Sequence, residues 1–296
     1  MSTNSSTATA DALEKLAPVE FSPRSIVVPL DGSQDSEAAL PIAAYFAEVF
    51  GVDIRVVHAT RTESIDDPGV AARFESHVAD LVTRGCLPAS TRTDVVAGAA
   101  SDVILAAVSE ADLVVLATHG HGGLQSALFG SVADKVVRGA KVPTIVVPVA
   151  HGPSPTPIRN VVIAVDESEC AEHAAAVGRH FAERCGAAVT LVNSYLPTPY
   201  AGGMEAAYVP LDTTEIEQRA SEALVAGAAE PGEKQFTVLG STVESIAEVA
   251  QQLGAELVVA GSSGRGYFGR LLLGSVSEGL MHRLDRPLLV VPSPPK

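Results

Sequence analysis

The feature that most constrains the fold is an internal repeat, because the two halves of the chain have similar sequences. The segment SIVVPLDGS at 25–33 resembles NVVIAVDES at 160–168. A longer match joins ADLVVLATHGHGGLQSALFGSV at 111–132 to AELVVAGSSGRGYFGRLLLGSV at 255–276. The period is almost half of the chain, which is far longer than a solenoid repeat, so the sequence predicts a duplicated domain.

The spacing of the repeats locates an insertion. The first match begins at 25 and again at 160, whereas the last match, VPTIVVP with RPLLVVP, begins at 142 and again at 286. The second half is therefore longer between these two points, and we place its extra residues in a loop at 195–212. We expect this loop and the one at 60–70 to be mobile segments over the crevices, as lids or as plain variable surface.

Composition suggests where the domains begin and end. The segment 1–22 is rich in Ser, Thr and Ala and is predicted to form a disordered tail. The stretch PVAHGPSPTPIRN at 148–160 holds four prolines, which favour an extended linker. We therefore expect domains at 23–149 and 159–296, joined by a linker at 150–158.

Each half alternates short Val/Ile/Leu runs with amphipathic segments, which is typical of a parallel sheet covered by helices on both faces. Helices are predicted at 36–51 and 169–186, each ending at a glycine. The predicted strands of the first half are 25–30, 53–59, 92–97, 112–117 and 143–148. Those of the second half are 160–165, 188–194, 235–239, 256–261 and 287–292.

We predict two open, doubly wound α/β sheets with strand order 3-2-1-4-5. Ligands bind such sheets where the strand order reverses, here between the first and fourth strands. The first strand ends at Asp31 in one half and at Asp166 in the other. Each aspartate has two interpretations, which are capping of the next helix and contact with a ligand hydroxyl or amine.

The fourth strand of the second half runs into a glycine-rich loop, Gly261 to Ser275. Glycines permit positive φ and close approach of a ligand to the backbone. The helix after Gly274 offers free N–H groups and a positive dipole end to an anion. The alternative is that Gly264 only makes a turn and Ser275 only caps the helix. The repeat of this spacing after the fourth strand favours phosphate binding.

At these residues the chain resembles the universal stress protein family in its tandem form, over about 24–292. Nucleotide-binding members carry G-x2-G-x9-G-(S/T) after the fourth strand and an Asp after the first. The second half has the whole motif in Gly261, Gly264, Gly274 and Ser275, with Asp166 upstream. The resemblance implies an adenine nucleotide alpha hydrolase-like fold and ATP, with or without Mg²⁺, as ligand.

The first half departs from this pattern, because Ala117 replaces the first glycine before Gly120, Gly130 and Ser131. If that position needs positive φ or touches phosphate, the methyl weakens binding. By analogy with the family, further contacts fall on both halves. They are the backbone of Ala59 and Ser194 near adenine, the N–H groups of Val132 and Val276, and Arg265, which either faces phosphate or is solvated.

Composition limits the partners. The net charge of −15 opposes nucleic-acid binding, and no apolar run approaches the length of a membrane span. Three unpaired cysteines fit a reducing cytoplasm. His119 and His121 form an H-x-H pair that is more typical of polar surface than of a metal site.

In the family that the chain resembles, the fifth strands pair in dimers. We therefore expect 143–148 and 287–292 to pair and to form a pseudo-dimer within one chain. Formation of a homodimer by two chains is a second possibility.

Three functions remain open from the sequence. No Walker lysine and no kinase or hydrolase motif is present, so we expect a nucleotide-binding regulator with an unidentified protein partner rather than an enzyme. The second function is a slow ATPase or autokinase with Ser131 or Ser275 as acceptor. The third is a stress-induced interaction module without bound nucleotide.

Overall fold

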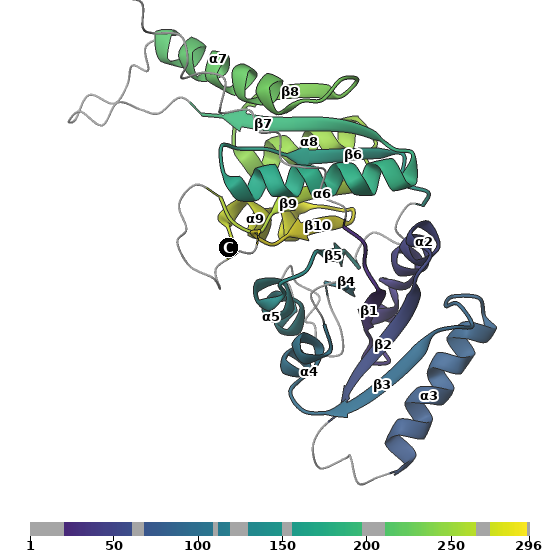
Figure 1. Ribbon diagram of the computed structural model, residues 1–296. Coiled ribbons are helices and arrows are strands. Elements are labelled where there is room, and N and C mark those ends of the chain that lie inside the picture. The colour runs from purple at the N-terminus through teal and green to yellow at the C-terminus, as the bar shows by residue number, and fades with distance from the viewer. Residues whose placement is uncertain are drawn as a thin grey trace, which may run out of the picture.

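In the computed structural model (Figure 1), two similar α/β halves follow one another along the chain. The structure describes residues 21–60, 68–108, 112–118, 130–149, 156–196, 211–264 and 273–294. Most of the predicted tail and linker lies outside these residues, as do most of the two loops predicted over the crevices. Within the described part of the chain, no helix is long and apolar enough to cross a membrane.

The ten predicted strands are all present. Those of the first half are β1 (Ser25–Pro29), β2 (Asp53–Thr60), β3 (Arg92–Ala97), β4 (Leu113–Ala117) and β5 (Thr144–Val147). Those of the second half are β6 (Asn160–Ala164), β7 (Ala188–Tyr195), β8 (Lys234–Leu239), β9 (Leu257–Gly261) and β10 (Leu288–Val291). The strands of each half are parallel, in the predicted order 3-2-1-4-5.

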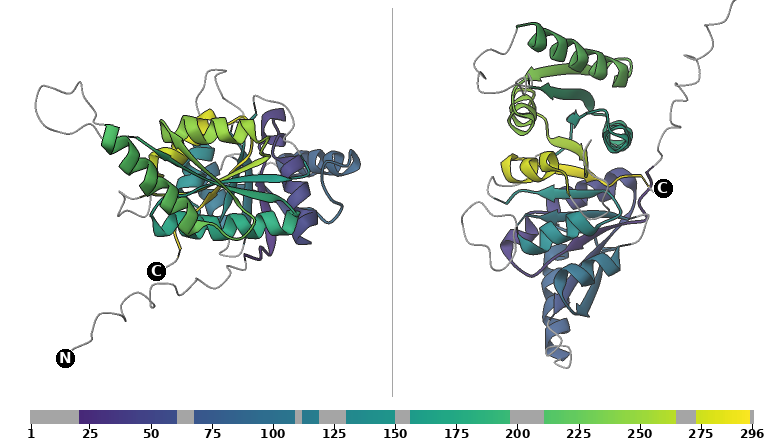
Figure 2. Two further views of the ribbon diagram at one scale, coloured as in Figure 1. Left: turned by 90° about the horizontal axis from the view of Figure 1, so that it is seen from above. Right: turned by 90° about the vertical axis from the view of Figure 1, so that its left-hand side faces the viewer.

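The two sheets join into one sheet of ten strands, β3-β2-β1-β4-β5-β10-β9-β6-β7-β8. The junction is an antiparallel pairing of β5 with β10, in which Ile145 lies opposite Leu289. The expected pseudo-dimer within one chain is therefore confirmed. Figure 2 shows the strands fanning through the middle of the molecule with helices on both sides.

Helices connect the strands. In the first half they are α1 (Gln34–Glu37), α2 (Leu40–Phe50), α3 (Pro68–Thr83), α4 (Ala100–Ala107) and α5 (Ser131–Gly139). In the second half they are α6 (Glu169–Cys185), α7 (Leu211–Ala228), α8 (Thr242–Gln252) and α9 (Ser275–Arg283). One continuous core runs through both halves beneath α2, α3, α6 and α7.

The prediction of one helix over 36–51 was wrong, because the segment is split between α1 and α2. Pro41 has no N–H to donate to the carbonyl of Glu37, so a helix cannot run unbroken through this point. The second half has Ala176 at the corresponding position, and α6 is continuous. The predicted helix ends are confirmed, since Gly51 and Gly186 adopt left-handed φ values of 68° and 67°.

The position of the predicted insertion agrees with the element boundaries. The interval from the start of β6 to the start of β7 equals the interval from the start of β1 to the start of β2. By contrast, α7 begins later after β7 than α3 begins after β2. Most of the extra length therefore lies between β7 and α7, within the predicted segment at 195–212.

Aromatic rings join the two halves beside the β5–β10 pairing. Phe181 of α6 is fully buried, and its ring centroid lies 5.2 Å from that of Phe46 and 5.0 Å from that of Phe50, both on α2. Arg184 donates a hydrogen bond to the backbone oxygen of Val49 over 2.7 Å. On the opposite face of the sheet, α5 and α9 are joined by an ion pair between Arg138 and Glu278.

We expect Phe181→Ala to lower the free energy of unfolding by about 3–5 kcal/mol, because the cavity would open between rings of both halves. Phe236→Ala is a control, since Phe236 is partly buried on β8, the outer strand of the second half and far from the β5–β10 junction. Denaturant titration followed by circular dichroism measures both variants. A loss for Phe181→Ala no larger than that for Phe236→Ala would contradict the role given to this ring.

Candidate functional site

A cleft of about 560 Å³ opens at the carboxyl ends of the strands in the second half. It lies where β6 and β9 are neighbours, which is the predicted point of reversal in strand order. Seven predicted site residues, far apart in the sequence, line this one cleft. They are Asp166, Ser194, Gly261, Gly264, Gly274, Ser275 and Val276.

Asp166 is held in place by the residue that caps the next helix. Its Oδ1 accepts hydrogen bonds from the backbone N–H of Ser168 (2.8 Å) and from the Ser168 hydroxyl (2.5 Å). Ser168 in turn accepts a hydrogen bond from the N–H of Ala171 and is the N-cap of α6. The interpretation of Asp166 as the helix cap was wrong, because the cap is two residues later.

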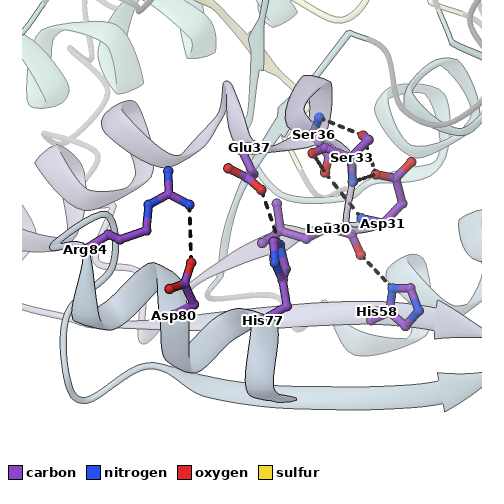
Figure 3. A network of polar contacts seen from close by, with 9 residues as sticks. All are labelled: Leu30, Asp31, Ser33, Ser36, Glu37, His58, His77, Asp80 and Arg84. Carbon is purple, nitrogen blue, oxygen red and sulfur yellow. Dashed lines mark hydrogen bonds and ion pairs between the residues drawn. The ribbon is translucent and has the colours of Figure 1, made fainter. Parts of the chain in front are cut away.

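The first half repeats this arrangement. Asp31 Oδ1 accepts from the N–H and the hydroxyl of Ser33 over 2.9 and 2.5 Å, and Ser33 caps α1 by accepting from the N–H of Ser36 (Figure 3). Asp31 is therefore not the helix cap either. In both halves the aspartate orients the capping serine from the end of the first strand.

The Asp166 carboxylate faces the glycine-rich loop, although the two are far apart in the sequence. A Cβ placed on Gly264 would stand 3.1 Å from Asp166 Oδ2. Any side chain at Gly264 would therefore crowd the carboxylate. The structure thus brings the aspartate and the loop together in one crevice, as the topology predicts.

Space, rather than unusual backbone geometry, explains the glycines of the loop. Gly261, Gly264 and Gly274 are not among the glycines with positive φ, so the positive φ that glycine permits is not used at these three positions. A Cβ on Gly261 would stand 2.8 Å from the Sγ of Cys170. A Cβ on Gly274 would meet the Cα of Ser263 at 3.3 Å.

The start of α9 is open to a ligand. Gly274 is its N-cap, without a side-chain hydrogen bond, and Ser275 is the first helical residue. The alternative in which Ser275 only caps the helix was therefore wrong. The α5 helix starts in the same way, with Gly130 as its N-cap and Ser131 as its first residue. The starts of α1 and α6, by contrast, are closed by serine hydroxyls.

A polar wall that the sequence motifs did not reveal completes the cleft. Asn193 donates from Nδ2 to the backbone oxygen of Val165 (2.7 Å) and accepts from the Ser221 hydroxyl (2.6 Å). The Ser194 hydroxyl donates to Thr242 Oγ1 over 2.8 Å. These residues come from β7, α7 and α8, and no spacing pattern connects them. Only the position of Asn193 beside the predicted Ser194 gave a signal.

The remaining predicted residues fall in two groups. In the first half, Asp31, Ala59 and Ala117 lie at the ends of β1, β2 and β4, while Gly130, Ser131 and Val132 form the start of α5. The second group lies outside the described residues, and it consists of Gly120, Arg265, and the two histidines His119 and His121.

We expect Gly261→Ala to lower the free energy of unfolding by about 1–3 kcal/mol, because the new methyl would overlap Cys170. Gly227→Ala on α7 is the matched control, since nothing lies within 4 Å of its Cβ position. Thermal unfolding of both variants measures the difference. A Gly261→Ala variant as stable as Gly227→Ala would show that the loop yields to the methyl.

The sequence matches known proteins along most of its length. The model of the universal stress protein family matches residues 23–148 and again 157–292. A universal stress protein of Mycobacterium tuberculosis strain H37Rv is 30% identical over 288 residues, covering 90% of this chain and 96% of the relative. A second one from that strain is 27% identical over 304 residues, covering 91% and 95%.

Solved structures share the fold. The crystal structure of a universal stress protein from Archaeoglobus fulgidus superimposes with a TM-score of 0.65 at 21% identity, covering 93% of this chain and 100% of that one. A Pseudomonas aeruginosa protein described as functionally unknown also gives 0.65, at 18% identity, covering 92% and 94%. Two tandem family matches and a relative matched over almost its whole length lead to one conclusion: the chain belongs to the universal stress protein family.

Proposed function

We propose that this chain is an ATP-binding universal stress protein that acts as a nucleotide-dependent regulator, and that the second-half cleft holds the nucleotide. One observation carries the proposal. The uncapped start of α9, the space above Gly264 and the Asp166 carboxylate all meet in a single cleft. Its volume of about 560 Å³ falls within the usual range for small-molecule sites.

The start of α9 suits the phosphates. Its N-cap, Gly274, has no side chain that could accept from the first N–H groups, and the positive end of the helix dipole favours an anion there. Ser275 adds a hydroxyl at the first helical position. Glu278 brings a negative charge to the first turn, but Arg138 of the other half lies 3.1 Å from its carboxylate and offsets that charge.

The opposite end of the cleft suits the nucleoside. Asp166 keeps one carboxylate oxygen on Ser168, and the other faces the cleft at Gly264, where it can accept from a ribose hydroxyl. The backbone at Ser194 and the side chains of Asn193 and Thr242 offer donors and acceptors to the base.

A magnesium ion, if present, would arrive with the nucleotide. Among the described residues, no group of three or more His, Cys, Asp or Glu side chains could hold a metal ion. The triphosphate would supply most of the ligands, because Mg²⁺ is commonly bound through substrate phosphates and one or two carboxylates. Asp166 is the carboxylate nearest the glycine loop in the described part of the cleft.

Regulation fits these residues better than rapid turnover. The Walker lysine that bridges β- and γ-phosphates is absent from the sequence. Bound ATP would then change an equilibrium of conformation or assembly through its different affinity for the two states.

We propose the cytoplasm as the location, where ATP is abundant and the free thiols of Cys86, Cys170 and Cys185 stay reduced.

The test is to denature freshly purified protein and to quantify the nucleotide released, alongside a Gly264→Val variant. We expect the wild-type chain to carry adenine nucleotide, or to take it up with magnesium, and the variant to bind at least tenfold less. The added side chain would occupy the space between the loop and Asp166. Turnover measured in parallel should be slow or absent.

A Gly227→Val variant controls for the substitution itself, because its Cβ position has nothing within 4 Å. It should retain the wild-type nucleotide content. A wild-type chain that neither carries nucleotide nor takes it up from ATP and magnesium would refute the proposed function. Equal binding by wild type and Gly264→Val would refute the proposed site.

A further inference from the structure

The two halves can be compared position by position around their crevices. The registers repeat, since Ala59 lies opposite Val96 in the first half and Ser194 opposite Val238 in the second. The turns before α4 and α8 also correspond, because Gly98 and Gly240 share a φ of 150°. The α3 and α7 helices are aligned from their first residues, and so are α5 and α9. Residues of β7, α7, α8 and α9 that line the second cleft therefore have identifiable counterparts in the first half.

Hydroxyl groups of the second cleft are replaced by apolar side chains in the first half. Four of the serines and threonines that line the second cleft, one each from β7, α7, α8 and α9, have Ala or Val at their counterparts. The pairs are Ser194 and Ala59, Ser221 and Val78, Thr242 and Ala100, and Ser277 and Ala133.

Two aromatic rings stack in the first half where the second half opens its cleft. Asn193 and Glu217 line the second cleft, and their counterparts are His58 and Phe74. The His58 and Phe74 ring centroids lie 4.0 Å apart with an interplanar angle of 16°, and Phe74 is only 7% exposed. The Nδ1 of His58 lies 2.9 Å from the backbone oxygen of Leu30, which fixes the ring (Figure 3).

A further contact joins α3 to α1 in this half. The Nε2 of His77 lies 3.2 Å from Glu37 Oε1, which joins α3 to α1, although the angle is not that of a hydrogen bond (Figure 3). The counterparts in the second half are Ala220 and Glu172, which cannot form this pair. The α3 helix therefore contacts α1 through a residue pair that has no equivalent between α7 and α6.

We infer that only the second half of the chain binds nucleotide, so that one chain binds one nucleotide. The inference rests on the proposed function. In the first half the stacked His58–Phe74 pair stands at the positions whose counterparts, Asn193 and Glu217, line the second cleft. In the second half the four hydroxyls hydrogen-bond to one another, to Asn193 and to the Gly261 backbone. Their apolar counterparts cannot build this polar wall, so a ribose and base would meet fewer polar partners in the first half, which opposes binding.

The experiment is equilibrium dialysis of the full chain against labelled ATP with magnesium, read as moles bound per mole of chain. We expect one for the wild type. Asn193→His with Glu217→Phe introduces the ring pair into the second cleft and should weaken binding at least tenfold. Glu222→Phe, at an exposed position on the same helix, is the matched control and should still bind one.

If circular dichroism shows that the ring-pair variant does not fold, Gly264→Val shows instead which half binds the nucleotide. We expect it to leave no binding to the chain. Two nucleotides per wild-type chain, or one remaining in Gly264→Val, would overturn the inference while leaving nucleotide binding intact. Full binding by a folded ring-pair variant would also overturn it. No binding by the wild type would refute the proposed function, and the inference with it.

Discussion

The antiparallel pairing of β5 with β10 is the interaction on which the rest of the molecule depends. Both strands are buried along their whole length, as TIVV and LLVV. Left as sheet edges, such apolar strands would present unpaired backbone groups to other chains. By pairing them within one chain, the duplication removes two edges and fixes the halves in one orientation. The outer edges are then β3 and β8, whose strands are more polar and more exposed.

This pairing also sets the relation between the two crevices. The helices α5 and α9, which start at the glycine–serine pairs of the two halves, lie close enough for Arg138 to contact both Asp134 and Glu278. On the other face, the rings of Phe46, Phe50 and Phe181 pack between α2 and α6. Two of the helices that line the candidate cleft, α6 and α9, thus also contact the first half, one on each face of the junction.

Much of the fold could be predicted from the sequence, because its signals are local or repeated. Buried strands appear as short Val/Ile/Leu runs, and helices end at Gly51 and Gly186 because left-handed φ favours glycine. The break at Pro41 had a local signal that the apolar periodicity concealed. The polar wall of the cleft was beyond prediction, since Asn193 and Ser221 meet only after α7 packs on β7.

The change from Gly261 to Ala117 shows why a motif has to be interpreted with its packing partners. Gly261 lies against Cys170 on α6, where a methyl would not fit, and its backbone oxygen accepts a hydrogen bond from Ser277. The counterpart of Cys170 is Asp35, which is exposed on the short α1. The Ala117 methyl is itself buried, so the first half accommodates a side chain at this position.

The substitution in the motif is accompanied by changes in the residues packed against it. The counterpart of Ser277 is Ala133, so the hydroxyl that fixes the strand end in the second half has been lost together with the glycine. Gly261 and the two residues that contact it, Cys170 and Ser277, are thus all replaced in the first half, by Ala117, Asp35 and Ala133. Sequence identity within a short motif is thus a weaker guide to function than the set of residues that surrounds it.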